Sequence, residues 1–148
     1  METATKSIRP EDEIILVEVV SYPATPNVQA ILTLSDGRKI EFHNKMVDLA
    51  ERFEEGEIQI SANPSIGTDA TISRTHGGRI TSISELRTAE YKTMSGYFFE
   101  FSDGNLTITA GAAPFSLFVS NGGTEFGRPE YKVSEYKRRE IEAIQPAS

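Results

Sequence analysis

The spacing of apolar and polar residues along the chain predicts a fold built mainly from β-strands. Residues 14–22 (IILVEVVSY) are β-branched and nearly continuously apolar, as in a strand that is covered on both faces. Residues 57–62 (EIQISA) alternate with a period of two, as in a half-buried strand. The same reasoning predicts further strands at 28–34, 38–43, 70–74, 79–86, 97–101, 105–110 and 115–120.

Two copies of Ser-Asp-Gly predict hairpins between these strands. Asp-Gly between alternating apolar residues marks a tight turn, because glycine reaches positive φ without steric cost. The first copy, at 35–37, is predicted to form a three-residue loop. That loop would pair Leu32 with Ile40 and, two residues further along, Ala30 with Phe42, all on one face.

The second copy, at 102–104, is predicted to turn through Asp103 and Gly104 alone. That shorter loop would pair Phe101 with Leu106 and Phe99 with Ile108. A third hairpin is expected around residues 75–78, because the two strands predicted on either side flank a glycine-rich turn.

Two segments have helical spacing instead. Asn44 is predicted to cap a helix over residues 45–54, where the apolar residues fall on one stripe. Ser134 is predicted to cap a carboxy-terminal helix that runs to about Ile144. The predicted fold class is therefore α+β and β-rich: an antiparallel, hairpin-built sheet, bent or half-closed like a barrel, with one central and one C-terminal helix.

The length of 148 residues and an apolar content of 38% predict a single domain with a real core. We expect a flexible N-terminal tail at 1–12, one β-rich domain at 13–145 and a short C-terminal tail at 146–148. The chain has no cysteine, which excludes disulfides, thiolate metal ligands and cysteine nucleophiles. It also has neither a long apolar run nor the apolar core of a signal peptide, so we expect a cytoplasmic protein that does not associate with membranes.

The charge pattern favours a protein partner. The net charge is −7, and a field of that sign repels nucleic acid and anionic lipid while it attracts cationic surfaces. The first hypothesis is therefore a non-enzymatic module that engages, and in doing so inhibits, a basic protein. Immunity proteins and phage-encoded inhibitors have this general composition, which is an analogy only. The carboxylates assigned to the partner surround the predicted central helix: Asp48, Glu51, Glu54, Glu55 and Glu57.

Catalytic signatures are missing from the sequence. The chain has two histidines, and His43 is predicted to bond local backbone at a strand end. Dinucleotide, P-loop, zincin, EF-hand and G-x-S-x-G motifs do not occur, so we assign no catalytic, cofactor or metal residues and no cofactor. An enzyme whose site is assembled only by the fold or by a homo-oligomer stays open as an alternative.

A second alternative is a protein that binds a small anionic ligand. Arg74, His76 and Arg79 surround the turn at 77–78 and could hold an anion at the mouth of a half-closed barrel, with Tyr97 lining it. The other basic cluster is Lys132 with residues 137–139. On the predicted C-terminal helix it is interpreted as a solvent face that nearby glutamates offset.

Overall fold

The computed structural model describes residues 7–50, 53–89 and 92–146, and these are mostly β-strand. The described part of the chain contains one short 3-10 helix, η1 (Val133–Glu135), and no α-helix. No helix in it has the length and apolar character to cross a membrane. The strands, in chain order, are β1 (Ile14–Tyr22), β2 (Thr25–Leu34), β3 (Lys39–Ala50), β4 (Phe53–Ser61), β5 (Thr71–Thr75), β6 (Ile80–Thr88), β7 (Met94–Phe101), β8 (Gly104–Ala110), β9 (Leu117–Asn121), β10 (Thr124–Phe126) and β11 (Tyr136–Ile141).

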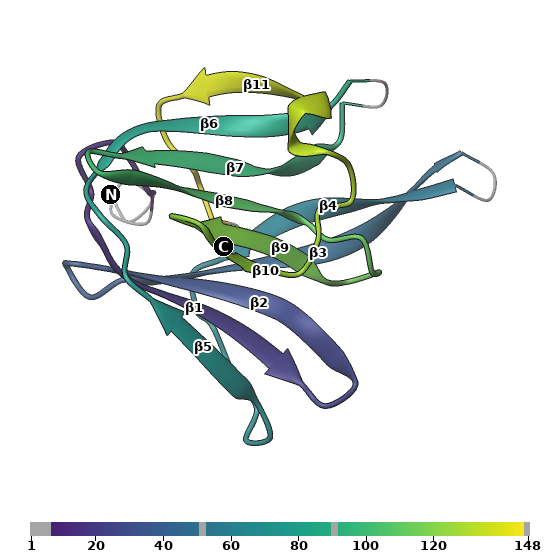
Figure 1. Ribbon diagram of the computed structural model, residues 1–148, viewed down its shortest axis with the longest axis horizontal. Coiled ribbons are helices and arrows are strands. Elements are labelled where there is room, and N and C mark those ends of the chain that lie inside the picture. The colour runs from purple at the N-terminus through teal and green to yellow at the C-terminus, as the bar shows by residue number, and fades with distance from the viewer. Residues whose placement is uncertain (1–6, 51–52, 90–91, 147–148) are drawn as a thin grey trace.

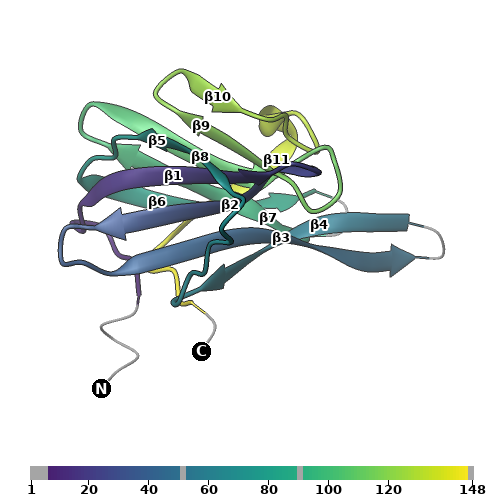
Figure 2. The ribbon, with the colours of Figure 1, turned by 90° about the horizontal axis from the view of Figure 1, so that it is seen from below.

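These strands form two antiparallel sheets that pack face to face as a sandwich (Figure 1). The five-stranded sheet has the order β4-β3-β2-β1-β5, and the six-stranded sheet has the order β10-β9-β8-β7-β6-β11. Figure 2 views the five-stranded sheet from below, with the six-stranded sheet behind it. The antiparallel, hairpin-built character that the sequence predicts is present, but the single bent sheet is replaced by two.

The first predicted hairpin is confirmed in its register. Leu32 lies opposite Ile40 and Ala30 lies opposite Phe42. The Leu34 N–H donates to the Arg38 carbonyl at 2.8 Å, which closes a loop of three residues. Gly37 ends that loop at φ +94°, a conformation that favours glycine.

The second hairpin turns one residue earlier than predicted, which shifts the pairing of its strands by two residues. Phe99 pairs with Leu106, and Phe101 pairs with Gly104, so Ser102 and Asp103 form the turn. Neither of these two residues has a positive φ. That is typical of a type I turn, in which glycine follows the two central residues. Because a shift of two residues preserves the faces, Phe99 and Leu106 are still fully buried.

The predicted central helix is wrong, because residues 45–54 belong to the hairpin of β3 and β4. Val47 pairs with Glu55, and Asp48 pairs with Glu54 across this hairpin. Asn44 does not cap a helix; its side-chain amide donates at 2.8 Å to the carbonyl of Ser116, in the loop just before β9. Pairing along the whole of β3 and packing between the sheets outweigh the local helical spacing, as tertiary contacts commonly do.

The predicted C-terminal helix is also wrong. Ser134 lies in η1, and the following residues form β11, which pairs with the open edge of β6. The strand supplies β6 with backbone partners that an isolated helix would not provide. The first and last described segments also meet: Ile8, placed by the sequence in a tail, is fully buried and exchanges two backbone hydrogen bonds of 2.9 Å with Ile144.

The third predicted hairpin does not form. β5 pairs with β1 in one sheet, and β6 pairs with β7 in the other. Residues 76–78 therefore carry the chain from one sheet to the other. Gly77 suits this crossing, because a Cβ at its position would collide with Ile14.

The core lies between the sheets and centres on aromatic rings. The ring of Phe42 in β3 meets Tyr97 edge-on at 5.9 Å and Phe99 edge-on at 6.3 Å, both in β7. The sheets approach closely near Gly56 of β4, where an added Cβ would come within 2.7 Å of the Ala110 Cβ. Large rings meet at one place between the sheets and small residues meet at another, so the two layers fit together in one packing arrangement.

Phe99→Ala is expected to lower the free energy of unfolding by about 3–5 kcal/mol, because it empties a fully buried aromatic site. Glu100→Ala is the matched control, since the neighbouring side chain is 48% exposed, and it should change stability by less than about 1 kcal/mol. Urea unfolding followed by circular dichroism measures both. Similar losses in the two variants would contradict the assignment of faces in β7.

Candidate functional site

The carboxylates predicted to bind a partner are not on one surface. Asp48 and Glu54 are exposed and opposite each other near the end of the β3–β4 hairpin. Glu57 is half-buried, and Glu55 is only 1% exposed. Glu51 lies outside the described residues. The structure therefore leaves Asp48 and Glu54 as the exposed pair of this set and moves Glu55 into the interior.

Glu55 joins the two sheets. Its carboxylate accepts a hydrogen bond of 2.5 Å from the Tyr131 hydroxyl and one of 3.2 Å from the Thr88 hydroxyl. Burial and the hydrogen bond to Glu55 hold the pKa of Tyr131 well above its usual range. Beside it, the Glu130 carboxylate accepts the Gly56 N–H at 3.0 Å, and burial raises the pKa of Glu130. These contacts tie β4 to the loop before β11, which gives Glu55 a structural role.

The residues predicted to hold an anion at the 77–78 turn do not converge. Arg74 donates to Glu18 at 3.0 Å, whereas Arg79 lies 3.8 Å from a different carboxylate, that of Glu11. The side chain of His76 is exposed. Tyr97 is in the core against Phe42, and burial raises its pKa to about 12. The turn therefore offers exposed cations, each with its own carboxylate.

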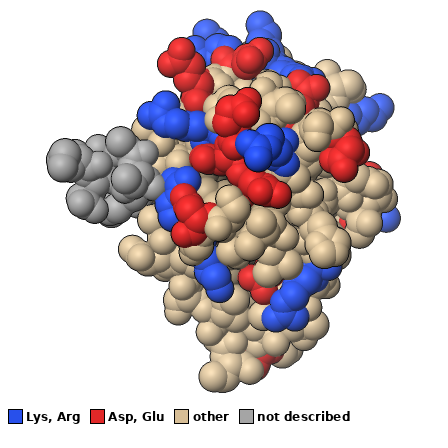
Figure 3. Space-filling view, turned by 90° about the vertical axis from the view of Figure 1, so that its left-hand side faces the viewer, with Lys and Arg blue, Asp and Glu red and all other residues tan. Residues whose placement is uncertain are grey.

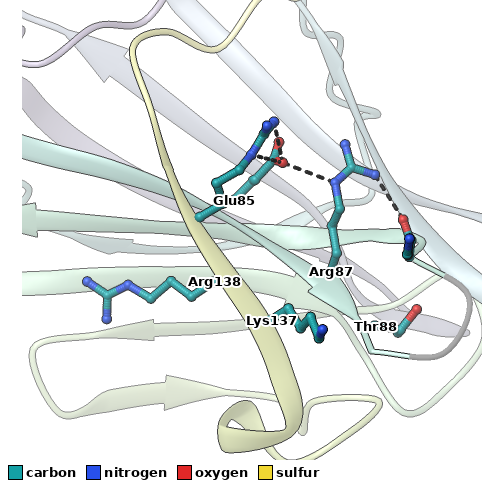
Figure 4. A pocket seen from close by; sticks show the side chains of 7 residues that line it. Glu85, Arg87, Thr88, Lys137 and Arg138 are labelled. Atoms are coloured by element: carbon teal, nitrogen blue, oxygen red, sulfur yellow. Dashed lines mark hydrogen bonds and ion pairs between the residues drawn. The ribbon is translucent and has the colours of Figure 1, made fainter.

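A cationic cleft with a volume of about 670 Å³ lies instead over the paired strands β6 and β11 and is lined by their side chains (Figure 4). Its lining combines five cationic side chains with one carboxylate and one hydroxyl: Glu85, Arg87, Thr88, Lys92, Lys137, Arg138 and Arg139. The formal charge of this lining is +4, in a chain whose formal net charge is −7. We refer to it as the cationic cleft.

Strand pairing creates the cleft from two distant parts of the chain. Lys137 pairs with Arg87, and Arg139 pairs with Glu85. Residues that face each other in antiparallel strands share one face of the sheet, so these pairs lie together. Arg138 pairs with Leu86 and therefore belongs to the opposite face.

Glu85 orients two of the guanidinium groups. Its Oε1 accepts from Arg87 Nε at 3.1 Å and from two nitrogens of Arg139 at 2.9 and 2.7 Å (Figure 4). The Glu85 side chain is 9% exposed, whereas those of Arg87 and Arg139 are 41% and 74% exposed. A guanidinium has five N–H donors, so both arginines keep donors for a ligand. The buried carboxylate thus holds two exposed cations in place.

Two further contacts define the rim. Arg87 also donates to the Lys92 carbonyl at 2.9 Å, which ties the loop after β6 to the cleft. Arg138 points away from Glu85 and Arg87 in Figure 4; its guanidinium lies 4.2 Å from the centre of the Phe98 ring and donates to Glu100 at 3.3 Å. This stacking and pairing occupy Arg138 on the outer face.

Charges of both signs are mixed on the side of the molecule that lies to the left in Figure 1. Figure 3 shows lysine, arginine, aspartate and glutamate side chains interspersed in the upper part of that view, while the lower part is mostly uncharged. The net negative charge is therefore not gathered into one acidic patch on that face. This arrangement weakens the expectation of a broad acidic docking surface there.

Sequence reasoning missed the cleft because it placed residues 137–139 on a helix. The sequence did contain one usable signal. Lysine and arginine are concentrated at residues 137–139 in a segment short enough to be a strand, and such residues are typical of a protected sheet edge. The partner strand, β6, was predicted, but nothing local connects Arg139 to Glu85, which is 54 residues away.

Comparison of the chain with protein-family models, with curated proteins and with solved structures finds no match. The functional argument therefore depends on the geometry of the chain itself.

Glu85→Gln is expected to lower the free energy of unfolding by about 1–3 kcal/mol, because it leaves Arg87 and Arg139 without their shared carboxylate. Glu140→Gln removes the same charge from an exposed neighbour on β11 and should have a much smaller effect. Thermal and urea unfolding of the two variants measure the difference. Equal stability of both variants would contradict the anchoring role of Glu85.

Proposed function

We propose that this chain is a non-enzymatic binding module that holds an anionic group, a phosphate or a carboxylate, in the cationic cleft. The observation that carries the proposal is the convergence of four cationic side chains on one cleft of a chain with net charge −7, while Arg138, the fifth cation of its lining, turns to the outer face. At physiological salt, charges further apart than about 8 Å are largely screened. Short-range contacts in the cleft therefore outweigh the repulsion from the rest of the chain.

The arrangement of the cations also supports this function. Arginine matches the planar geometry of carboxylate and phosphate oxygens and can bind two of them at once. Arg87 and Arg139 are already oriented by Glu85, so a ligand need not order them itself. The exposed side chains of Lys92 and Lys137 add positive charge that can adjust to the shape of the ligand.

The hydroxyl group of the cleft supports binding over catalysis. The Thr88 hydroxyl donates to Glu55 at 3.2 Å and accepts the Thr93 N–H at 3.1 Å. Thr88 is 5% exposed and Glu55 is 1% exposed, so this hydroxyl and carboxylate are buried in a contact between the two sheets and are not presented to a ligand.

Replacing Lys92 and Lys137 together by glutamine is expected to weaken binding of inorganic pyrophosphate about tenfold, which corresponds to about 1.4 kcal/mol. The matched control replaces Lys39 and Lys45, exposed lysines of β3, and removes the same charge away from the cleft. Isothermal titration calorimetry at fixed salt compares the two double variants. Equal weakening in both, or unchanged binding in the cleft variant, would contradict the proposal.

A second candidate function is the binding of a basic protein partner at the hairpin of β3 and β4. Asp48 and Glu54 lie opposite each other there, and like charges at opposed positions repel. The hydrogen bond with Asp48 and the charge of Asp48 raise the pKa of Glu54. Figure 1 shows this hairpin extending beyond the rest of the sandwich. A cationic partner would relieve the repulsion at its end.

Asp48→Asn combined with Glu54→Gln should slow association with a lysine homopolymer and leave the melting temperature unchanged or raised. The reason is that both side chains are exposed and repel each other. The control removes two exposed carboxylates elsewhere, with Glu11→Gln and Glu125→Gln. Stopped-flow association rates that fall equally in both variants would show an effect of net charge alone.

A further inference from the structure

One edge of the six-stranded sheet is open for a further strand. β11 pairs with β6 on one side, and no strand of the described residues lies on its other side. At such an edge, alternate residues point their N–H and C=O groups outward, ready to pair with another strand. β11 spans six residues, which is enough for a partner of about 20 Å.

The other edges of the two sheets are less suited to a new strand. On β4, the Gly56 N–H is already taken by the Glu130 carboxylate at 3.0 Å. β10 has only three residues. β5 carries a single cation, Arg74, which pairs with Glu18. β11 is thus the edge that combines open backbone with concentrated charge.

The side chains of β11 select the occupant. Lys137 and Arg139 lie on the cleft side of the sheet, and Arg138 lies on the other side, so an incoming strand meets cations on both of its faces. The β11 strand of a second copy would bring the same charges and be repelled. A strand with glutamate or aspartate at alternate positions presents these carboxylates on one face, where they complement Lys137 and Arg139 on the cleft side.

We infer that β11 accepts an acidic peptide in extended conformation as a seventh strand of the sheet. This inference rests on the proposed function and names its ligand: the peptide carboxylates enter the cationic cleft and meet Lys137 and Arg139. Backbone hydrogen bonds to β11 provide affinity, and the alternate carboxylates provide specificity, as in other cases of strand addition. Arg138, on the outer face, keeps its contacts with Phe98 and Glu100.

The test compares three peptides of equal length by isothermal titration calorimetry. The first alternates glutamate and threonine, the second is the same peptide N-methylated at its central amides, and the third alternates lysine and threonine. We expect the first to bind, the second to bind at least tenfold more weakly because it cannot form the backbone bonds, and the third not to bind. Hydrogen exchange of the backbone amides at 137–139 should slow with the first peptide alone.

Each other outcome separates this inference from the proposed function. Equal binding of the first and second peptides would show that charge alone is recognised, which overturns strand addition. Binding of pyrophosphate without binding of the glutamate peptide also overturns it and leaves the proposed function in place; the cations of β11 would then only guard the edge against self-pairing. If neither pyrophosphate nor the first peptide binds, both proposals fail.

Discussion

The contact of Phe42 with Tyr97 and Phe99 is the interaction on which the two-layer arrangement depends. Edge-on ring pairs contribute about 0.5–1.5 kcal/mol each beyond the burial of their area, and they fix how one sheet lies over the other. With β3 fixed against β7 in this way, β4 comes to lie where Glu55 reaches Thr88 at the end of β6. The position of the cationic cleft relative to the core therefore follows from a contact that contains no charged group.

Local signals predicted the parts of this fold that are held by neighbours in sequence. The turn at 35–37 and the pairing of Leu32 with Ile40 depend on one glycine and on the faces of two adjacent strands, and both are readable along the chain. The strand at 136–141 depends on a partner about fifty residues away, so its helical spacing misled the prediction. The same holds for the cleft. The basic run is visible in the sequence, but its position beside Glu85 and Arg87 depends on the register of β11 with β6, which only the assembled sheet provides.

The buried carboxylate of Glu85 both stabilises the cleft and orients its cationic side chains. Burying an anion alone is costly, and two arginines that share it offset that cost and still leave an excess of positive charge facing solvent. A cleft formed only by cations would repel itself and hold its side chains loosely. Here the stabilising contact and the orientation of the binding groups are the same set of hydrogen bonds.

The backbone bridge between Ile8 and Ile144 has a consequence for how this domain can be joined to other sequences. Because Ile8 and Ile144 exchange hydrogen bonds of 2.9 Å, the first and the last described segments of the chain lie side by side. Linking them directly and opening the chain at the exposed turn of Ser102 and Asp103 would give a circular permutant with the same strand neighbours. The domain could equally be inserted into a surface loop of another protein, which needs only two adjacent points of attachment.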